Sequence, residues 1–247
     1  MGENDCSAEI EELQSIINKY DNIVFFGGAG VSTESGIPDF RSVDGLYNQK
    51  YDYPPETILS HTFYVKHPAE FYRFYRDKLI CRGVKPNPAH LKLAELEKAG
   101  KVKAVITQNI DGLHQAAGSS EVLELHGSNL RNYCIKCGEF YGIDYIADSP
   151  DAVPKCSKCG GDIKPDVVLY EEGLNMDILQ KAVHYIANAQ VLIIGGTSLA
   201  VYPAAGLISY FKGEKLVVIN MAPTAVDATA DLVIAAPIGK VFSQIKI

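Results

Sequence analysis

Short, predominantly apolar runs alternate with amphipathic segments along most of the chain. The runs have the length of β-strands and lie at 22–26, 102–106, 191–196, 215–220 and 231–236. Their low polar content is typical of strands that are buried on both faces. The amphipathic segments have helical periodicity and lie at 7–20, 87–100 and 176–189. This alternation predicts an α/β fold with a doubly wound, parallel, Rossmann-like sheet.

Helix ends and interruptions refine this prediction. Asn87 followed by Pro88 is a helix-start signal, and Gly100 predicts the end of the same helix. Two segments break the rhythm, because 37–85 is rich in Tyr, Phe and Pro without a strand pattern and 128–162 contains two cysteine pairs. We predict a helical insert at 37–85, a second insert at 128–162, and one sheet domain formed by 1–36, 86–127 and 163–247.

The composition is that of a globular protein with a large core. Of its 247 residues, 47% are hydrophobic and 21% are charged, which suffices for one large domain with small inserts. No apolar run approaches the roughly 18 residues of a membrane span, and the acidic start "MGENDCSAEIEEL" lacks the order of a signal peptide. The net charge, 23 minus 30 or −7, argues against a general nucleic-acid surface. We expect a cytoplasmic protein without membrane binding or direct nucleic-acid binding.

Glycines and polar residues follow the first apolar run in "FFGGAGVSTESGIPDFRS", residues 25–42. Glycines after a strand let backbone amides approach a pyrophosphate, although G28-A-G30-V-S-T33 lacks the third glycine of G-x-G-x-x-G. A tight structural turn explains the glycines equally well. Ser32 and Thr33 are candidates for phosphate contacts or for capping the next helix. Asp39 and Arg41 place both signs of charge beside the same turn, which favours a binding site.

Polar residues also follow the second predicted strand. Gln108, Asn109, Asp111 and His114 come after "VIT", and ligands in open α/β sheets bind at the carboxyl ends of strands. An Asx turn that caps the following helix is an alternative role for Asp111. His126 follows the short apolar alternation "VLEL" and precedes a glycine, so it is a candidate acid or base as well as a structural histidine.

Four cysteines have the spacing of a metal site. Cys134-x2-Cys137 is followed after eighteen residues by Cys156-x2-Cys159, which is typical of a four-thiolate zinc site. Four thiolates leave no position for a catalytic water, so this zinc-ribbon insert would have a structural metal. Two disulfides are the alternative, disfavoured by the lack of a secretion signal. We assign no role to Cys6 or Cys81.

Taken in order, seven motifs resemble the sirtuin family, the NAD-dependent protein deacylases, over nearly the whole chain. They are "GAGVSTESGIPDFRS", "TQNIDGLH", "LHG", the paired CxxC motifs, "KPDVVLYEE", "GGTSLAVYPAA" and "VVIN". The resemblance implies that NAD is consumed as a co-substrate: an acyl group moves from lysine to ADP-ribose, and nicotinamide is released. It also implies one structural zinc per chain, acyl-lysine proteins or peptides as substrates, an NAD-binding role for the sheet domain, and a cofactor loop within 37–85. We expect a monomer.

The resemblance carries roles over to individual residues. His126 would be the general base that takes a proton from the ribose hydroxyls, which allows the 2′-oxygen to attack an imidate formed at C1′. Pyrophosphate and ribose contacts would come from Gly28, Ala29, Gly30, Ser32, Gly196, Thr197 and Ser198. Ile37, Asn109 and Asp111, with Asp39 near them, would form the nicotinamide pocket, and Gln108 would contact the nicotinamide ribose. Phe40, Arg41 and Ile110 would be further NAD contacts. Asn220 would hold the adenosine ribose, and Ile238 would be a further NAD contact. The acyl-lysine peptide would lie as an added strand on Val168, Leu169 and Tyr170.

The chain departs from the family pattern at two positions. Ser42 and Glu171 stand where many members have glycine, and the second change puts a side chain at a turn beside the peptide segment. In "EFYRFYRDKL", Tyr75 stands three residues after Tyr72, where members that prefer succinyl-lysine have an arginine. Arg76 is one position further, about 100° around a helix, so we expect it to point away from the acyl channel. Acetyl and other short uncharged acyl groups are therefore the expected substrates.

Three other functions fit parts of the sequence. A Rossmann dehydrogenase would share the glycine turn, but it usually has an acidic residue after its second strand and has no use for the cysteine insert. A noncatalytic zinc- or NAD-binding module would explain the cysteines and leave the polar strand ends unexplained. Mono-ADP-ribosyl transfer to protein is an alternative activity within the resembled family.

Overall fold

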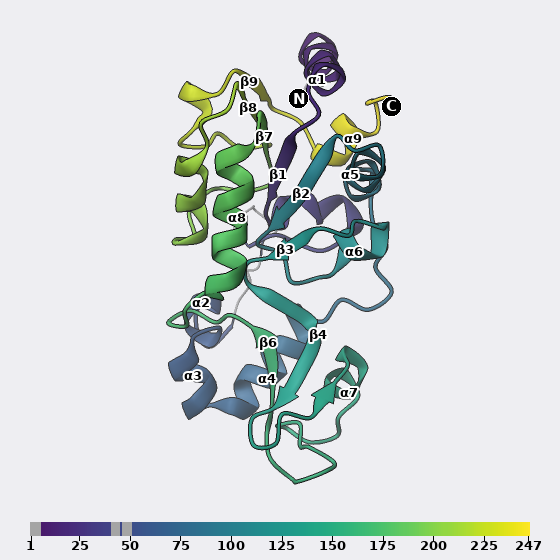
Figure 1. Cartoon of the computed structure of the whole chain (residues 1–247). Coiled ribbons are helices and arrows are strands. Elements are labelled where there is room, and N and C mark those ends of the chain that lie inside the picture. Colours follow the sequence, from purple (N-terminus) through teal and green to yellow (C-terminus); the bar gives the residue numbers. More distant parts are fainter. Residues whose placement is uncertain (1–5, 41–44, 46–50) are drawn as a thin grey trace.

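Six parallel strands form the central sheet in the order β3-β2-β1-β7-β8-β9 (Figure 1). The computed structural model describes residues 6–40, 45 and 51–247. The strands are β1 Ile23–Gly27, β2 Val102–Thr107, β3 Val122–Glu124, β7 Val191–Gly195, β8 Lys215–Ile219 and β9 Leu232–Ile234. The five strands predicted from the apolar runs are present, with ends within one or two residues of the prediction. The predicted α/β class with a doubly wound parallel sheet is confirmed.

Helices cover both faces of the sheet, which explains why its strands are apolar on both sides. On β1, Ile23 and Phe25 face one layer while Val24 and Phe26 face the other. The first layer contains α1 Ser7–Lys19, α5 Pro88–Lys98 and α9 Ile238–Phe242. The second contains α8 Met176–Asn188 and the 3-10 helix η4 Ala204–Tyr210, and Figure 1 shows α8 on the opposite side of the sheet from α5 and α9. Among the described residues, no helix combines the length and the apolar character needed to span a membrane.

Asn87 begins α5 and also fastens it to the segment after β1. Its side-chain oxygen accepts a hydrogen bond from the Ala89 N–H (2.9 Å), which confirms the predicted helix start. Its side-chain nitrogen donates to the Val31 carbonyl (2.7 Å) and to the Ser35 hydroxyl (3.0 Å). Gly100 follows the helix with φ +75°, a backbone conformation that glycine adopts without strain.

A smaller three-stranded sheet with the order β5-β4-β6 lies below the central one in Figure 1. Its strands are β4 Gly127–Cys134, β5 Phe140–Tyr141 and β6 Ile163–Val167, with helix α7 Ile143–Ala147 beside them. The sequence boundary at 162/163 assigns β6 to the large domain, but β6 pairs antiparallel with β4 from the insert. Strand pairing therefore associates 163–167 with the insert. The overall division into domains stays a prediction.

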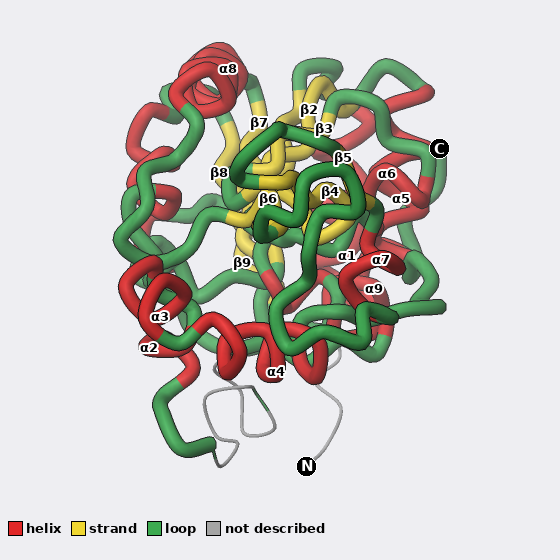
Figure 2. Tube along the Cα trace, turned by 90° about the horizontal axis from the view of Figure 1, so that it is seen from below, coloured by secondary structure: helices red, strands yellow, loops and turns green. Residues whose placement is uncertain are grey.

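The aromatic helix of the 37–85 segment packs against this smaller sheet. The segment forms α2 Pro55–Ile58, α3 His61–Lys66 and α4 Pro68–Lys78, which Figure 2 shows along one side of the molecule. Four aromatic side chains of α4 are almost fully buried and share one apolar cluster with Ile146 and Ile163 of the insert; they are Phe71, Tyr72, Phe74 and Tyr75. The two inserts thus have a common core. The remaining short helices are η1 Ala29–Val31, η2 Thr33–Ser35, α6 Leu113–Ala117 and η5 Asp227–Thr229.

We predict that Asn87→Ala lowers the free energy of unfolding by roughly 2–3 kcal/mol, because it removes a helix cap and two further hydrogen bonds of a buried side chain. Asn175→Ala is the matched control. Asn175 caps α8 by accepting from the Asp177 and Ile178 N–H groups but is exposed, so its loss should cost only about 1 kcal/mol. Urea unfolding of both variants measures the difference. Equal losses would contradict the linking role of Asn87.

Candidate active site and metal centre

The glycine turns that follow β1 and β7 touch each other through their backbones. The Gly28 N–H donates to the Gly195 carbonyl (3.2 Å), and the Gly30 N–H donates to the Gly196 carbonyl (2.8 Å). A Cβ atom on Gly30 would lie 2.8 Å from the Gly196 Cα atom, and one on Gly196, whose φ is +57°, would lie 2.3 Å from the Val31 nitrogen. Glycine is therefore required by chain packing alone.

This contact lies where the strand order reverses, which is the position of ligand sites in open α/β sheets. The N–H groups of Gly28 and Gly30 both donate to carbonyls within the chain, so neither is free to donate to a pyrophosphate. The Ala29 N–H between them makes no hydrogen bond within the described part of the chain. The turn is therefore a tight structural turn, as the alternative prediction stated, and its Ala29 amide is still available to a ligand.

The hydroxyl of Ser32 joins the turn after β1 to the segment after β2. The side chain is 1% exposed, and its Oγ atom donates to Asp111 Oδ2 (2.7 Å) and accepts from Asn109 Nδ2 (3.1 Å). It does not cap the following η2 helix, and the Thr33 hydroxyl donates back to the Gly30 carbonyl (3.0 Å). The helix-capping alternative for these two residues is therefore wrong.

Asp111 and Asn109, which follow β2 two positions apart, both form hydrogen bonds with Ser32. The second carboxylate oxygen of Asp111 accepts from the Leu113 N–H (2.9 Å), so the predicted Asx turn before α6 is present. The Asp111 carboxylate thus accepts one hydrogen bond at the start of α6 and one from Ser32 in the polar cluster. Asn109 is 8% exposed, and its own N–H donates to the Thr107 hydroxyl (3.0 Å).

Gln108 connects the β7 turn with His126. Its side-chain nitrogen donates to Thr197 Oγ1 (3.0 Å), and its backbone carbonyl lies 3.0 Å from His126 Nδ1. Because a carbonyl only accepts, Nδ1 carries the proton and Nε2 has the free lone pair. Burial lowers the pKa of His126 below 6.5, although the hydrogen bond to the Gln108 carbonyl opposes this shift. The imidazole is therefore neutral at pH 7 and able to accept a proton at Nε2.

Two further histidines lie beneath this cluster. His90 Nδ1 accepts from the Asn87 N–H (3.3 Å), so its Nε2 is protonated and faces Ser32 Oγ at 3.5 Å. His90 was not among the predicted site residues, although Asn87-x-x-His90 has a capping-box spacing that places it in the first turn of α5. His114 does not reach the site: it is 1% exposed, packs against Phe25 and His90, and neither ring nitrogen has a hydrogen-bond partner among the described residues.

Burial keeps both of these histidines neutral. It lowers the pKa of His90 to about 4, with the charge of Asp111 opposing the shift. It lowers the pKa of His114 to about 3, and the neighbouring His90 contributes to the same shift. The cluster that contains Ser32 and Asp111 therefore borders uncharged rings.

The other predicted NAD contacts differ in exposure. Ile37 donates its N–H to the Ser32 carbonyl (3.2 Å), and Asp39 and Phe40 are half-buried. Ile110 is half-buried and accepts from the Asn129 N–H (3.0 Å) through its carbonyl. Ser198 is exposed, Asn220 donates to the Ala222 carbonyl (2.7 Å), and Ile238 is 3% exposed. Arg41, like Ser42, lies outside the described residues.

The segment Val168–Tyr170 runs from His126 toward α3. The Val168 N–H donates to the His126 carbonyl (3.0 Å), and the Tyr170 N–H donates to the Leu59 carbonyl (3.0 Å). Leu169 is 4% exposed and Tyr170 is 37% exposed. The segment is therefore held at both ends, beside the candidate base and beside the helical insert.

The four cysteines converge as a metal centre requires. Their Sγ atoms all lie within 4.8 Å of one another, and the separations include 3.4 Å for Cys134–Cys159 and 3.6 Å for Cys137–Cys156. Zinc–sulfur bonds of about 2.3 Å in a tetrahedron give sulfur separations of about 3.8 Å. A disulfide would need about 2.05 Å. All four thiols are free, so the disulfide alternative is wrong and the set fits a structural zinc ion.

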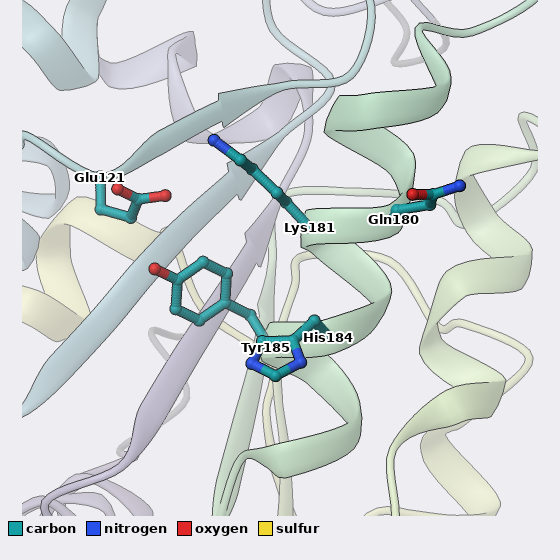
Figure 3. Close-up of a pocket in the computed structure, with 5 residues that line it drawn as sticks. All are labelled: Glu121, Gln180, Lys181, His184 and Tyr185. Atoms are coloured by element: carbon teal, nitrogen blue, oxygen red, sulfur yellow. The ribbon is translucent and has the colours of Figure 1, made fainter.

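A surface hollow of about 470 Å³ lies away from these residues. Its lining comes from α8 and from Glu121 beside β3, and Figure 3 shows Glu121 across from Lys181 and Tyr185. None of the residues predicted for the site lines it.

Comparisons with known proteins agree on one family. A model described as "Sir2 family" matches residues 28–203. The NAD-dependent protein deacetylase of Clostridium acetobutylicum is 58% identical over 239 residues, which cover 96% of this chain and 98% of that protein. A solved Sir2 structure with a deacetylated p53 peptide and 3′-O-acetyl ADP-ribose has a TM-score of 0.88 and 38% identity, covering 95% of this chain and 96% of the other. A Sir2–p53 peptide–NAD+ structure has a TM-score of 0.85 and 39% identity, with the same coverage.

We predict that one equivalent of zinc copurifies with the protein and that Cys137→Ser abolishes its binding, because a three-thiolate set lacks the fourth protein ligand of a structural site. Removing the metal should unfold the β4–β6 insert before the central sheet. Metal analysis and hydrogen exchange measure the two effects. Cys6→Ser, outside the cluster, should retain the full equivalent. Wild-type protein without zinc, or an intact insert after complete chelation, would contradict the prediction.

Proposed function

This chain belongs to the Sir2 family, and we propose that it is an NAD-dependent protein lysine deacetylase. The reaction converts acetyl-lysine, NAD and water into lysine, nicotinamide and O-acetyl-ADP-ribose. NAD is a co-substrate and is consumed. The observation that carries the proposal is the polar cluster at the strand-order reversal, where Ser32, Asn109 and Asp111 are joined and a neutral His126 lies next along the same edge.

In this proposal the two glycine turns hold the pyrophosphate. The Ala29 amide, which has no hydrogen bond within the described residues, supports a direct contact, while Gly28 and Gly30 let the chain pass close enough to make it. The contacts from the second turn are assigned to Gly196, Thr197 and Ser198. Asn220 and Ile238 are assigned to the adenosine side.

The nicotinamide pocket is assigned to the segment after η2 and the segment after β2. Its members are Ile37, Asp39, Phe40, Arg41, Asn109, Ile110 and Asp111, with Gln108 at the nicotinamide ribose. The hydrogen bonds from Asn109 to Ser32 and from Ser32 to Asp111 support this assignment, because they fix two of the side chains before any ligand binds.

His126 is assigned as the general base. Its Nε2 atom would accept a proton from the ribose hydroxyls, and the Gln108 carbonyl would hold the ring in the required tautomer. The acyl-lysine peptide is assigned to Val168, Leu169 and Tyr170, a segment whose first N–H is bonded to His126 itself. This link would place the acyl group beside the base. The zinc centre takes no part in the chemistry, because four thiolates leave no open position.

We further propose that the protein works in the cytoplasm as a monomer and binds neither membrane nor nucleic acid directly. The free thiols support a reducing compartment, and the net charge of −7 disfavours a nucleic-acid surface.

The test is mass spectrometry of an acetyl-lysine peptide incubated with enzyme and NAD, with nicotinamide measured in parallel. We expect equimolar lysine peptide, nicotinamide and acetyl-ADP-ribose. His126→Ala should lower kcat by roughly 100-fold or more, the usual scale for loss of a general base, with NAD binding largely retained. Because the pKa of His126 lies below 6.5, wild-type activity should persist at pH 7 and decline only as the pH falls below that value and Nε2 becomes protonated.

His184→Ala is the control, because His184 is exposed on the outer face of α8. Its turnover should equal that of the wild type. A His126→Ala enzyme with near-native turnover would remove the base assignment, and the absence of nicotinamide release from the wild type would remove the proposed function.

The acyl preference follows from the position of Arg76. Its Nε atom donates to the Ile146 carbonyl (2.9 Å) and its Nη2 atom donates to the Asp151 carbonyl (2.8 Å), both in the zinc insert. The guanidinium also lies 5.7 Å from the centre of the Tyr72 ring. These contacts support the expectation that Arg76 points away from an acyl channel and cannot pair with a succinyl carboxylate.

We therefore predict a kcat/KM on acetyl-lysine peptide at least about ten-fold above that on the succinyl form, because a carboxylate without a cation pays its desolvation cost unpaired. Arg76→Gln should leave the ratio of the two values unchanged within about two-fold. Steady-state kinetics on matched peptides decides the question. A preference for succinyl that disappears in Arg76→Gln would show that this arginine serves the channel.

A further inference from the structure

The segment assigned to the peptide is fastened to the N-terminus of α3 by main-chain hydrogen bonds. The Tyr170 N–H donates to the Leu59 carbonyl (3.0 Å), and the His61 N–H donates to the Tyr170 carbonyl (2.9 Å). Ser60 and Tyr170 form an isolated parallel bridge. The first turn of α3 is thus continuous with the end of the peptide segment.

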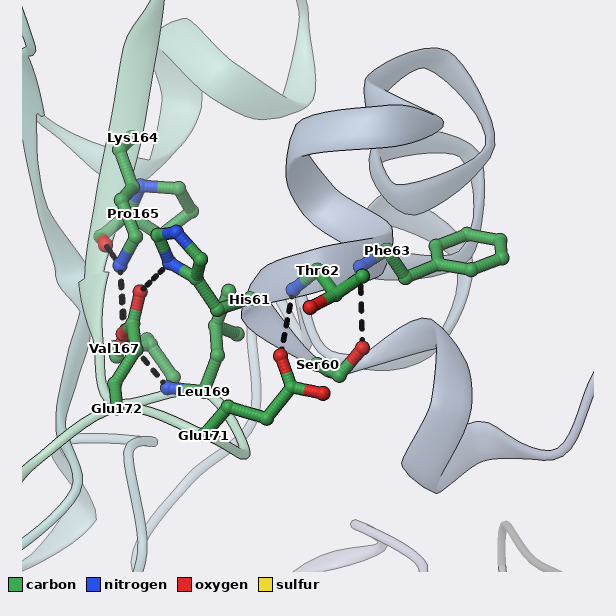
Figure 4. A network of polar contacts seen from close by, with 10 residues as sticks. All are labelled: Ser60, His61, Thr62, Phe63, Lys164, Pro165, Val167, Leu169, Glu171 and Glu172. Atoms are coloured by element: carbon green, nitrogen blue, oxygen red, sulfur yellow. Dashed lines mark hydrogen bonds and ion pairs between the residues drawn. The ribbon is translucent and has the colours of Figure 1, made fainter.

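Glu171 adds a side-chain link at the same place. Its φ is +74°, a left-handed conformation that costs a residue with a Cβ atom about 1 kcal/mol and that glycine adopts freely. Its carboxylate nevertheless accepts from the Thr62 N–H (2.9 Å), one of the free donors in the first turn of α3 (Figure 4). This bond from Thr62 lowers the pKa of Glu171. Glu171 thus has a strained backbone, but its carboxylate caps α3, which a glycine at this position could not do.

Glu172 holds the segment from the other side. One of its oxygens accepts from the Leu169 N–H (3.0 Å) and from Lys164 Nζ (3.1 Å), and the other lies 2.9 Å from His61 Nδ1 (Figure 4). Burial raises the pKa of Glu172, but the hydrogen bonds from Leu169 and His61 outweigh it and the net shift is downward. The carboxylate therefore joins β6, the peptide segment and α3.

We propose that Glu171 and Glu172 act as a carboxylate clasp, which positions Val168–Tyr170 for the peptide and sets peptide affinity without taking part in the chemistry. The inference rests on the proposed function, because it concerns the peptide site of that function. Glu171 and Glu172 are positioning residues that act through the main chain between them and His126.

Two main-chain groups at the edge of residues 168–171 that form no hydrogen bond within the described residues support a role in peptide binding. The N–H groups of Val168, Leu169 and Tyr170 are all bonded within the chain. Within the described residues, the Val168 carbonyl and the Glu171 N–H have no hydrogen-bond partner. An incoming extended peptide would pair with such groups, and the conformation of Glu171 sets the direction of its N–H. The clasp therefore controls the direction of a donor at the edge of the segment.

Glu171→Gly separates this role from a merely structural one. Glycine relieves the left-handed strain while the cap is lost, so the two effects on stability oppose each other and the Tm should change little. The KM for an acetyl-lysine peptide should rise about five-fold, the factor that corresponds to one lost helix cap, while kcat and the KM for NAD stay within about two-fold. Glu171→Gln keeps an acceptor oxygen and should restore most of the peptide affinity.

Glu12→Gly is the matched control. Glu12 is exposed in the middle of α1, far along the chain from the peptide segment, so glycine there should lower the Tm and leave the peptide KM unchanged. Hydrogen exchange at Thr62, which needs no activity, reports the clasp directly and should be faster in Glu171→Gly.

The outcomes separate two failures. If the wild type is active but Glu171→Gly and Glu171→Gln have the same peptide KM, the positioning role is overturned. Hydrogen exchange at Thr62 that is equally slow in Glu171→Gly and in the wild type would overturn it too. A wild type that releases no nicotinamide overturns the proposed function. In that event anisotropy with a labelled acetyl-lysine peptide still decides on the clasp: tighter binding to the wild type than to Glu171→Gly supports it, and equal or absent binding refutes it.

Discussion

The backbone contact between the turns after β1 and β7 is the constraint on which the site depends. Neighbouring parallel strands end at the same edge of the sheet, and their chains then diverge to opposite faces. At this edge Gly30 and Gly196 touch without side chains, since a Cβ atom on either would overlap the other's main chain. The close approach allows Ser32 to reach Asp111, and it allows Gln108 to reach Thr197. A larger residue at either glycine would separate the strands that carry the polar cluster.

Burial then determines the charge of the groups at this edge. Three histidines lie in or beneath it, and burial lowers the pKa of each below 6.5. All three rings stay neutral: His114 packs in the core, His90 accepts from the Asn87 N–H and faces Ser32, and His126 keeps the Nε2 lone pair free. The same physical effect thus gives a structural role to two rings and prepares the third to accept a proton. The difference lies in access, because His126 is only partly buried and bonds the Gln108 carbonyl on one side.

Sequence patterns predicted the features that depend on residues close together in the chain. The apolar runs located the strands, Asn87-Pro88 located a helix start, and the cysteine spacing located the four thiols. Contacts between distant segments were beyond such patterns. His114 follows a strand end like its polar neighbours, yet it is buried against Phe25, and the pairing of β6 with β4 became clear only in three dimensions. Glu171 looked like a disturbance of a glycine turn, but the turn keeps its left-handed conformation and the side chain caps α3.

The pairing of β4 with β6 explains why a metal without a catalytic role belongs to this fold. β4 begins directly after His126 and ends at Cys134, while β6 begins shortly after Cys159 and leads into Val168. In the antiparallel register Cys134 lies opposite Ile163 at the metal end, and Gly127 lies opposite Val167 at the other end. The hydrogen bond from Val168 to His126 closes the ladder there. Two strands therefore connect the thiolates to the candidate base and to the peptide segment. The register shifts between Ser128 and Asn132, so the strands pair in two stretches, one at the metal end and one at the His126 end. A metal that fixes the first stretch also constrains the second, because the same two strands form both.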